Sequence, residues 1–111
     1  MVDETITAIA TAPGEGGVGI IRISGPEALP VTEKIFHGKK SLSQVPSHQM
    51  IYGHICNREN QVIDEVLVVA MRSPHSYTRE DVVEIHCHGG MVPQRSILAL
   101  VVSHGIRMAE P

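Results

Sequence analysis

Residues 82–88 form the stretch that most narrows the possible folds, because their side chains alternate between apolar and polar. On an extended strand, successive side chains point to opposite faces, so the segment has one apolar face and one polar face. The pattern predicts a strand whose apolar face packs in the core and whose polar face forms a row, with neighbours about 6–7 Å apart. A glycine pair, Gly89 and Gly90, then allows a sharp turn or the close approach of another group. The apolar set is Val83, Ile85 and Cys87, and the polar set is Glu84, His86 and His88.

The polar row has two interpretations, the wall of a binding site or the ordinary solvated face of a strand. As a site, Glu84, His86 and His88 could bind zinc, which accepts carboxylate and imidazole ligands. The sequence holds no second cluster of cysteine and histidine to complete such a set, so we expect no metal. Glu84 could instead accept two parallel N–H bonds from an amidine-like edge, such as that of a pterin or a guanine.

Composition and charge limit the class of protein. With 111 residues, 42% hydrophobic and 19% charged, the chain suits one soluble globular domain. Its longest apolar run, residues 66–71, has the length of a buried strand and not of a membrane span, so no membrane partner is expected. The acidic N-terminus does not look like a secretory signal, and two cysteines make no disulfide framework, which indicates a cytoplasmic protein. A net charge of −3 argues against this chain alone holding a nucleic-acid backbone.

The order of apolar segments and turns predicts an α+β fold. A helix is expected to begin at Pro26 and end before Gly38 with Phe36 on its apolar side, and a second helix is expected over 92–103. The sheet should be mixed, of about five to six strands, with both helices on one side. The expected strands are 5–10, 18–24, 50–56, 62–71 and 82–88, with a last short one at 106–109, and the sheet-facing residues of the second helix are Ile97, Leu98, Val101 and Val102.

Arg22 is the second candidate site residue. It stands among isoleucines on the strand 18–24, and a guanidinium in such a setting costs desolvation energy unless a partner meets it. Arg22 therefore forms an internal salt bridge, lies on an exposed strand face, or acts as a fixed clamp for an anion.

The glycine-rich run from Gly14 to Gly19 precedes the strand that carries Arg22. It fits the dinucleotide pattern G-x-G-x-x-G, but a β-rich segment follows it where a helix would be required, so we exclude a dinucleotide site. The run is then either a loop that lets another group approach or a plain turn between strands.

Two long motifs resemble a known family. Residues 13–25 read Pro-Gly-Glu-Gly-Gly-Val-Gly-Ile-Ile-Arg-Ile-Ser-Gly, and residues 77–84 read Tyr-Thr-Arg-Glu-Asp-Val-Val-Glu, followed by His88-Gly89-Gly90. Together with the segment from Thr5 to Thr11, they resemble the N-terminal domain of the tRNA-modification GTPase family MnmE, also called TrmE. The resemblance runs from near residue 5 to the C-terminus.

The resemblance implies a fold similar to the tetrahydrofolate-binding domain of the glycine-cleavage T-protein family. It also implies a homodimer that binds a one-carbon folate at the subunit interface. The folate would be 5-formyltetrahydrofolate or 5,10-methylenetetrahydrofolate. Arg22 and Glu84 match the folate-contacting positions of the family's two motifs, so we expect both to bind the cofactor. No residue of the chain is expected to be catalytic.

The full-length family acts with a FAD-dependent partner, MnmG, to modify C5 of the wobble uridine of tRNA, using GTP, potassium and magnesium. This chain has no P-loop, helical domain or C-terminal catalytic cysteine, so it is expected to be the isolated N-terminal folate-binding and dimerisation domain, residues 1–111. GTP hydrolysis would then belong to the longer protein. The alternatives are a structural dimerisation module without a ligand and the zinc site described above.

Overall fold

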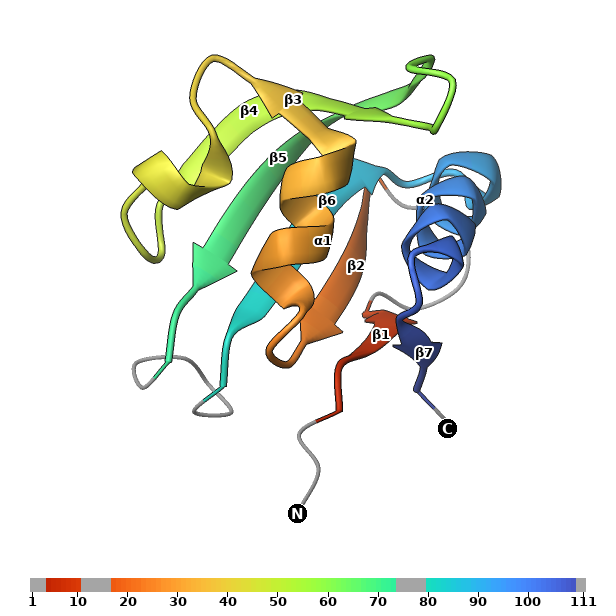
Figure 1. Cartoon of the computed structure of the whole chain (residues 1–111). Helices are drawn as coiled ribbons and strands as arrows, with labels where there is room; N and C mark the ends of the chain where they lie inside the picture. Colours follow the sequence, from red (N-terminus) through yellow and green to blue (C-terminus); the bar gives the residue numbers. More distant parts are fainter. Residues whose placement is uncertain (1–3, 11–16, 74–79, 110–111) are drawn as a thin grey trace.

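The computed structural model describes residues 4–10, 17–73 and 80–109. These residues form one seven-stranded sheet and two α-helices (Figure 1). The α+β class is confirmed, and the sheet has more strands than the five to six predicted. The strands are β1 (Ile6–Ile9), β2 (Val18–Ser24), β3 (Phe36–Gly38), β4 (Met50–Cys56), β5 (Val62–Met71), β6 (Val82–His88) and β7 (Arg107–Met108). The helices are α1 (Ala28–Ile35) and α2 (Met91–Ser103), and a 3-10 helix, η1, spans Leu42–Gln44.

β6 occupies the middle of the sheet. The strand order is β3-β4-β5-β6-β2-β1-β7, so β6 pairs with β5 on one side and with β2 on the other. The described strand pairs are antiparallel except β1 with β7, which is parallel, and the sheet is therefore mixed as predicted. A central strand is hydrogen-bonded along both edges, so its register fixes where its neighbours present their side chains.

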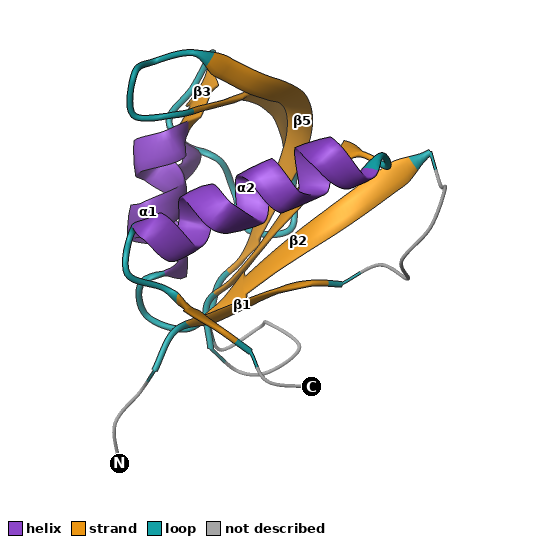
Figure 2. Ribbon diagram, turned by 90° about the vertical axis from the view of Figure 1, so that its right-hand side faces the viewer, coloured by secondary structure: helices purple, strands orange, loops and turns teal. Residues whose placement is uncertain are grey.

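Both helices cover the same face of the sheet (Figure 2). They pack on the apolar face of β6, where Val83, Ile85 and Cys87 are buried as the alternation predicts. Fully burying an aliphatic side chain of this size contributes about 1.5–3 kcal/mol to folding. The core therefore forms between the sheet and the helices. It also includes Ile21, Ile23, Ala28, Val31, Ile35, Val66, Val68, Ile97 and Val101. Neither described helix is long and apolar enough to cross a bilayer.

The first helix ends earlier than predicted. It stops at Ile35, and Phe36 begins β3, whose three residues pair with Gly53 to Ile55 of β4. The prediction placed Phe36 on the helix because local spacing cannot reveal a strand partner far along the chain. The β4 partner of this strand has to be a glycine at position 53, because a Cβ built on Gly53 would lie 2.5 Å from the Phe36 ring. The absent side chain leaves room for that ring against β4.

The buried face of α2 differs in part from the prediction. Ile97 and Val101 are buried as expected, and Leu98 packs partly against the core. Val102 is only half-buried, and Leu100 is buried instead. Gln94 completes this face, one helical turn before Ile97. Sequence reasoning missed Gln94 because a polar residue does not add to an apolar pattern.

We expect Gly53→Ala to destabilise the fold by about 1–3 kcal/mol, because the new methyl group overlaps both the His37 carbonyl oxygen and the Phe36 ring of β3. Urea denaturation followed by circular dichroism measures the loss. Gly17→Ala is the matched control, since a Cβ built there meets nothing within 4 Å. Equal stability of the two variants would show that β3 does not depend on this contact.

Candidate functional site

The candidate site lies on the open face of the sheet, opposite the helices. Glu84, His86 and His88 occupy this face of β6, and their alternation with the buried residues is the one predicted. The β2–β6 register places Arg22 directly opposite Glu84, while Ile21 opposite Ile85 faces the core. Two segments separated by about sixty residues in the sequence thus bring their polar side chains to one surface.

Arg22 and Glu84 form a salt bridge. The Arg22 side chain donates from Nε at 2.9 Å and from Nη2 at 2.6 Å, both to Oε2 of Glu84. The Glu84 side chain is 17% exposed, whereas that of Arg22 is 49% exposed. The pair therefore combines a mostly buried carboxylate with a guanidinium that still reaches solvent. Of the three interpretations of Arg22, the structure shows the internal salt bridge on a half-exposed strand face.

His86 occupies the other oxygen of Glu84. Its Nε2 lies 3.0 Å from Oε1, so the carboxylate has one partner on each oxygen. His88 instead pairs with Asp64 of β5, Nδ1 to Oδ1 at 2.7 Å, and its backbone N–H donates to Oδ2 at 2.9 Å. The three residues of the proposed zinc set are thus divided between two separate pairs. The described residues contain no group of three or more metal-ligating side chains arranged around one point.

The environment of Glu84 favours its charged form. Partial burial raises the pKa of this carboxyl, but the hydrogen bonds and charges of Arg22 and His86 outweigh burial, and the pKa lies below its ordinary value of 4.5. Glu84 is therefore an ionised acceptor at neutral pH, which a ligand with paired N–H donors requires.

Shallow hollows lie on both sides of the Arg22–Glu84 pair. The first, about 340 Å³, is lined by His86 and His88 of β6, by Leu67 of β5 and by Tyr52 of β4. The second, about 250 Å³, lies along β1 and is lined in part by Arg22. Both are open to solvent along the sheet surface. The ion pair thus separates two places where a ligand can rest against the sheet.

Gly19, Gly89 and Gly90 of the two motifs have structural contacts inside the chain. A Cβ built on Gly19 would lie 2.5 Å from the side chain of Gln94, whose amide donates to the carbonyl of Gly89 at 2.7 Å and to that of Gly90 at 3.3 Å. The close approach at Gly19 is therefore made by α2. Residues 13–16 and 77–79 of the motifs lie outside the described residues.

The two cysteines are buried and unsuited to reaction chemistry. Cys56 and Cys87 are both buried and unpaired. Burial, with a smaller contribution from the nearby charge of Asp64, raises the pKa of Cys87 to about 11. Its thiolate form is therefore scarce at neutral pH, and Cys87 serves as a small core residue.

Fold and site together define a class: an α+β domain with one helix-covered sheet face and one open face that carries an ionised acceptor and a guanidinium. The family model described as "GTP-binding protein TrmE N-terminus" matches residues 5–111. The chain belongs to this family, as the motifs predicted.

Curated relatives agree with this assignment. The tRNA modification GTPase MnmE of Alkaliphilus oremlandii is 57% identical over 99% of this chain and 24% of its own length. The proteins of the same name from Lactiplantibacillus plantarum and Staphylococcus haemolyticus are 57% and 50% identical, each over 97% of this chain and over 23% and 24% of their own lengths. The chain thus spans about a quarter of the length of the relatives it matches.

We expect Arg22→Gln to raise the pKa of Glu84, because the substitution removes the strongest partner of a carboxylate that stays partly buried. Carbon-detected NMR titration of the glutamate carboxyls measures the shift. Arg107→Gln removes a guanidinium that pairs with Glu4 and should leave the Glu84 titration unchanged. An unchanged Glu84 pKa in Arg22→Gln would contradict the electrostatic role of Arg22.

The same shift predicts how stability depends on pH. Because the folded pKa of Glu84 lies below its ordinary 4.5, the charged carboxylate stabilises the folded state above about pH 4.5. This contribution is lost as the pH falls through the folded pKa. The difference in unfolding free energy between the wild-type chain and Glu84→Gln should therefore narrow below pH 4.5, as measured by urea denaturation at several pH values. A difference that is constant with pH would contradict it.

Proposed function

We propose that this chain is a reduced-folate-binding and homodimerising module of a tRNA-modifying GTPase. The observation that carries the proposal is the Arg22–Glu84 pair at 2.6 Å on the open sheet face. These are the two positions that match the folate-contacting residues of the family motifs. Family membership supports the proposal because the relatives are named as tRNA modification GTPases.

Glu84 suits the donor edge of a pterin. The 2-amino group and N3–H of a pterin present two parallel donors, and an ionised carboxylate accepts both. In the free chain, Oε1 accepts from His86 and Oε2 accepts from Arg22. Binding would exchange at least one of these bonds for a ligand N–H. Such an exchange keeps the carboxylate paired and so avoids most of the cost of an orphaned buried charge.

Arg22 suits an acceptor or an anionic group of the ligand. Its guanidinium carries five donors, of which two bind Glu84, and about half of its side chain is exposed. The folate would be 5-formyltetrahydrofolate or 5,10-methylenetetrahydrofolate, each with oxygen and nitrogen acceptors around the reduced ring.

Dimerisation is supported by apolar side chains beside the polar row. Tyr52 pairs across the strands with Leu67, and Leu67 with His86, so the three share the open face. Tyr52 and Leu67 are 55% and 43% exposed, and Val18, opposite His88, is 54% exposed. Large exposed apolar groups next to polar ones are typical of interfaces. A second copy of the chain would cover them and enclose the ligand.

The chemistry of the longer protein follows from its family and is likewise a proposal. The folate would supply a one-carbon unit to C5 of the wobble uridine of tRNA, with a FAD-dependent MnmG-type partner. GTP, potassium and magnesium would act in a domain outside this chain. The present residues would bind and orient the carbon donor.

One observation favours a second candidate, a dimerisation module without a ligand. Both oxygens of Glu84 already have partners within the chain, so the polar row is satisfied without folate. Sedimentation with and without 5-formyltetrahydrofolate separates the two functions. A dimer whose sedimentation and stability ignore the folate would support the structural module.

We expect calorimetry to show binding of 5-formyltetrahydrofolate to the wild-type chain. Glu84→Ala and Arg22→Ala should each weaken it by about tenfold or more, since each removes charge-assisted hydrogen bonds. Glu59→Ala and Arg95→Ala are matched controls because both residues are exposed away from the open face, in the β4–β5 turn and on α2. Absence of binding heat, or wild-type affinity in both site variants, would overturn the proposal.

A further inference from the structure

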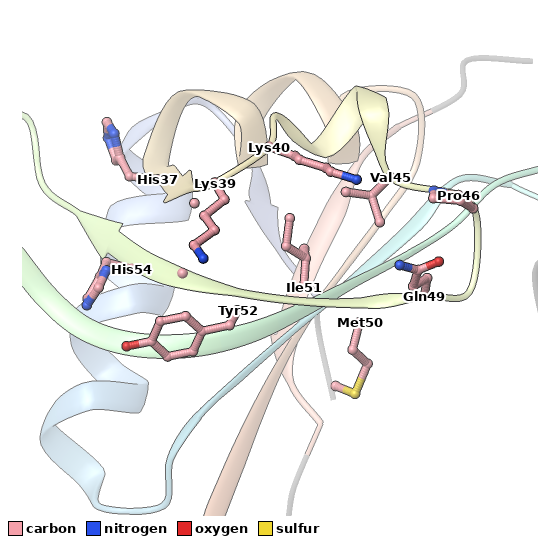
Figure 3. A pocket seen from close by; sticks show the side chains of 12 residues that line it. His37, Lys39, Lys40, Val45, Pro46, Gln49, Met50, Ile51, Tyr52 and His54 are labelled. Atoms are coloured by element: carbon pink, nitrogen blue, oxygen red, sulfur yellow. The ribbon is translucent and has the colours of Figure 1, made fainter.

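A further cavity lined by described residues lies away from the Arg22–Glu84 pair, beside β4 (Figure 3). Its volume is about 700 Å³, within the range of about 300–1,000 Å³ typical of small-molecule sites. It arises because β3 pairs only with Gly53 to Ile55. The edge of β4 before Gly53 therefore faces the segment 39–46, and the cavity lies between them.

The cavity combines an apolar wall with basic groups. Met50, Ile51 and Tyr52 of β4 line it, with the side chain of Ile51 on the opposite side of the strand from those of Met50 and Tyr52, and the segment opposite contributes Lys39 and Lys40. Figure 3 shows both lysine side chains extending over the cavity, Lys39 toward β4 and Lys40 toward Val45. The lining residues among the described part of the chain include no aspartate or glutamate, although the whole chain has a net charge of −3. The cavity is thus a local positive region suited to an anion.

Two histidines add hydrogen-bond donors at one end of the cavity. His37 and His54 are direct cross-strand partners in the β3–β4 pair, and both line the cavity. The ring of Tyr52 meets that of His54 edge to face, with centroids 5.6 Å apart, which holds His54 at the rim. An imidazole N–H can donate to a carboxylate oxygen. The site therefore offers two ammonium groups and two imidazoles around one space.

The cavity borders the hollow beside the ion pair at one residue. Tyr52 lines both spaces. Across the strands Tyr52 is paired with Leu67 and Leu67 with His86, so about two strand spacings, roughly 10 Å, separate Tyr52 from His86. Glu65, the acidic residue of that hollow, accepts the Tyr52 hydroxyl at 2.8 Å. An elongated ligand that lies across the open face beside Glu84 would therefore reach Tyr52, where the cavity begins.

We propose that this cavity binds the γ-linked glutamate carboxylates of the same reduced folate whose pterin occupies the Arg22–Glu84 site. The inference rests on the proposed function. A folate has the required form, a flat ring system joined through an aminobenzoyl group to glutamate residues, each of which adds a carboxylate. The ring would bind at Glu84, the aminobenzoyl group would lie over Leu67 and Tyr52, and the carboxylates would meet Lys39 and Lys40.

Calorimetry with three probes tests the inference: monoglutamyl 5-formyltetrahydrofolate, its pentaglutamate, and penta-γ-glutamate without the pterin. The wild-type chain should bind the pentaglutamate about tenfold more tightly than the monoglutamate, since partly exposed charge pairs contribute modestly and add up. In the variant Lys39→Gln/Lys40→Gln this gain should fall to about twofold or less. The control Lys34→Gln/Arg95→Gln removes the same charge from exposed helix positions and should keep the full gain. Added salt should reduce the gain in the wild-type chain.

The outcomes separate this inference from the proposed function. Equal affinity for the two folates, or a full gain in Lys39→Gln/Lys40→Gln, overturns the tail site and leaves folate binding at Arg22 and Glu84 standing. Binding of penta-γ-glutamate with no binding of either folate overturns both the proposed function and the assignment of the anion as a folate tail. No binding of any probe overturns both proposals.

Discussion

The register between β2 and β6 is the constraint on which the rest of the molecule depends. It places Ile21 and Ile23 opposite Ile85 and Val83 on the helix side, and Arg22 opposite Glu84 on the open side. Because side chains alternate with a period of two, a slip by one residue would bury the guanidinium and expose the isoleucines. The burial of four aliphatic side chains therefore also fixes the ion pair. Core packing and site geometry are set by the same pairing.

The two partners of the ion pair differ in burial and in how many of their hydrogen-bonding groups are used. Glu84 is mostly buried and needs partners, which Arg22 and His86 supply on separate oxygens. The Arg22 side chain is half exposed, and only some of its N–H groups donate to Glu84. The carboxylate is thus held charged and in place before any ligand arrives, while the guanidinium can still meet one. For the proposed folate site, such preorganisation would lower the cost of binding, since the chain already holds the carboxylate in place.

Much of this arrangement could be predicted from local sequence, because strand periodicity is strong in β2 and β6. The strands 18–24, 50–56 and 62–71 were predicted with the bounds observed, and so was the division of β6 into two faces. The parts that were missed depend on distant partners. Phe36 lies in β3 because its ring fits against Gly53. The side chain of His88 pairs with Asp64, and that of Gln94 packs on Gly19. No local pattern reveals such pairs. The salt bridge of Arg22 was one of several interpretations because its partner lies on another strand.

The helix-covered face of the sheet packs in the core, and the open face carries the candidate site. Substitutions on the two faces therefore have different expected effects. The helix side contains the clustered core, whereas the open side carries the ion pair and several exposed apolar side chains. Changes at exposed positions such as Lys39 remove no packing from that core and no partner of the buried carboxylate. Their thermodynamic effects should therefore appear in ligand binding more than in folding. Glu84 lies between these cases, since its buried carboxylate also contributes to stability through the charge that a ligand would use.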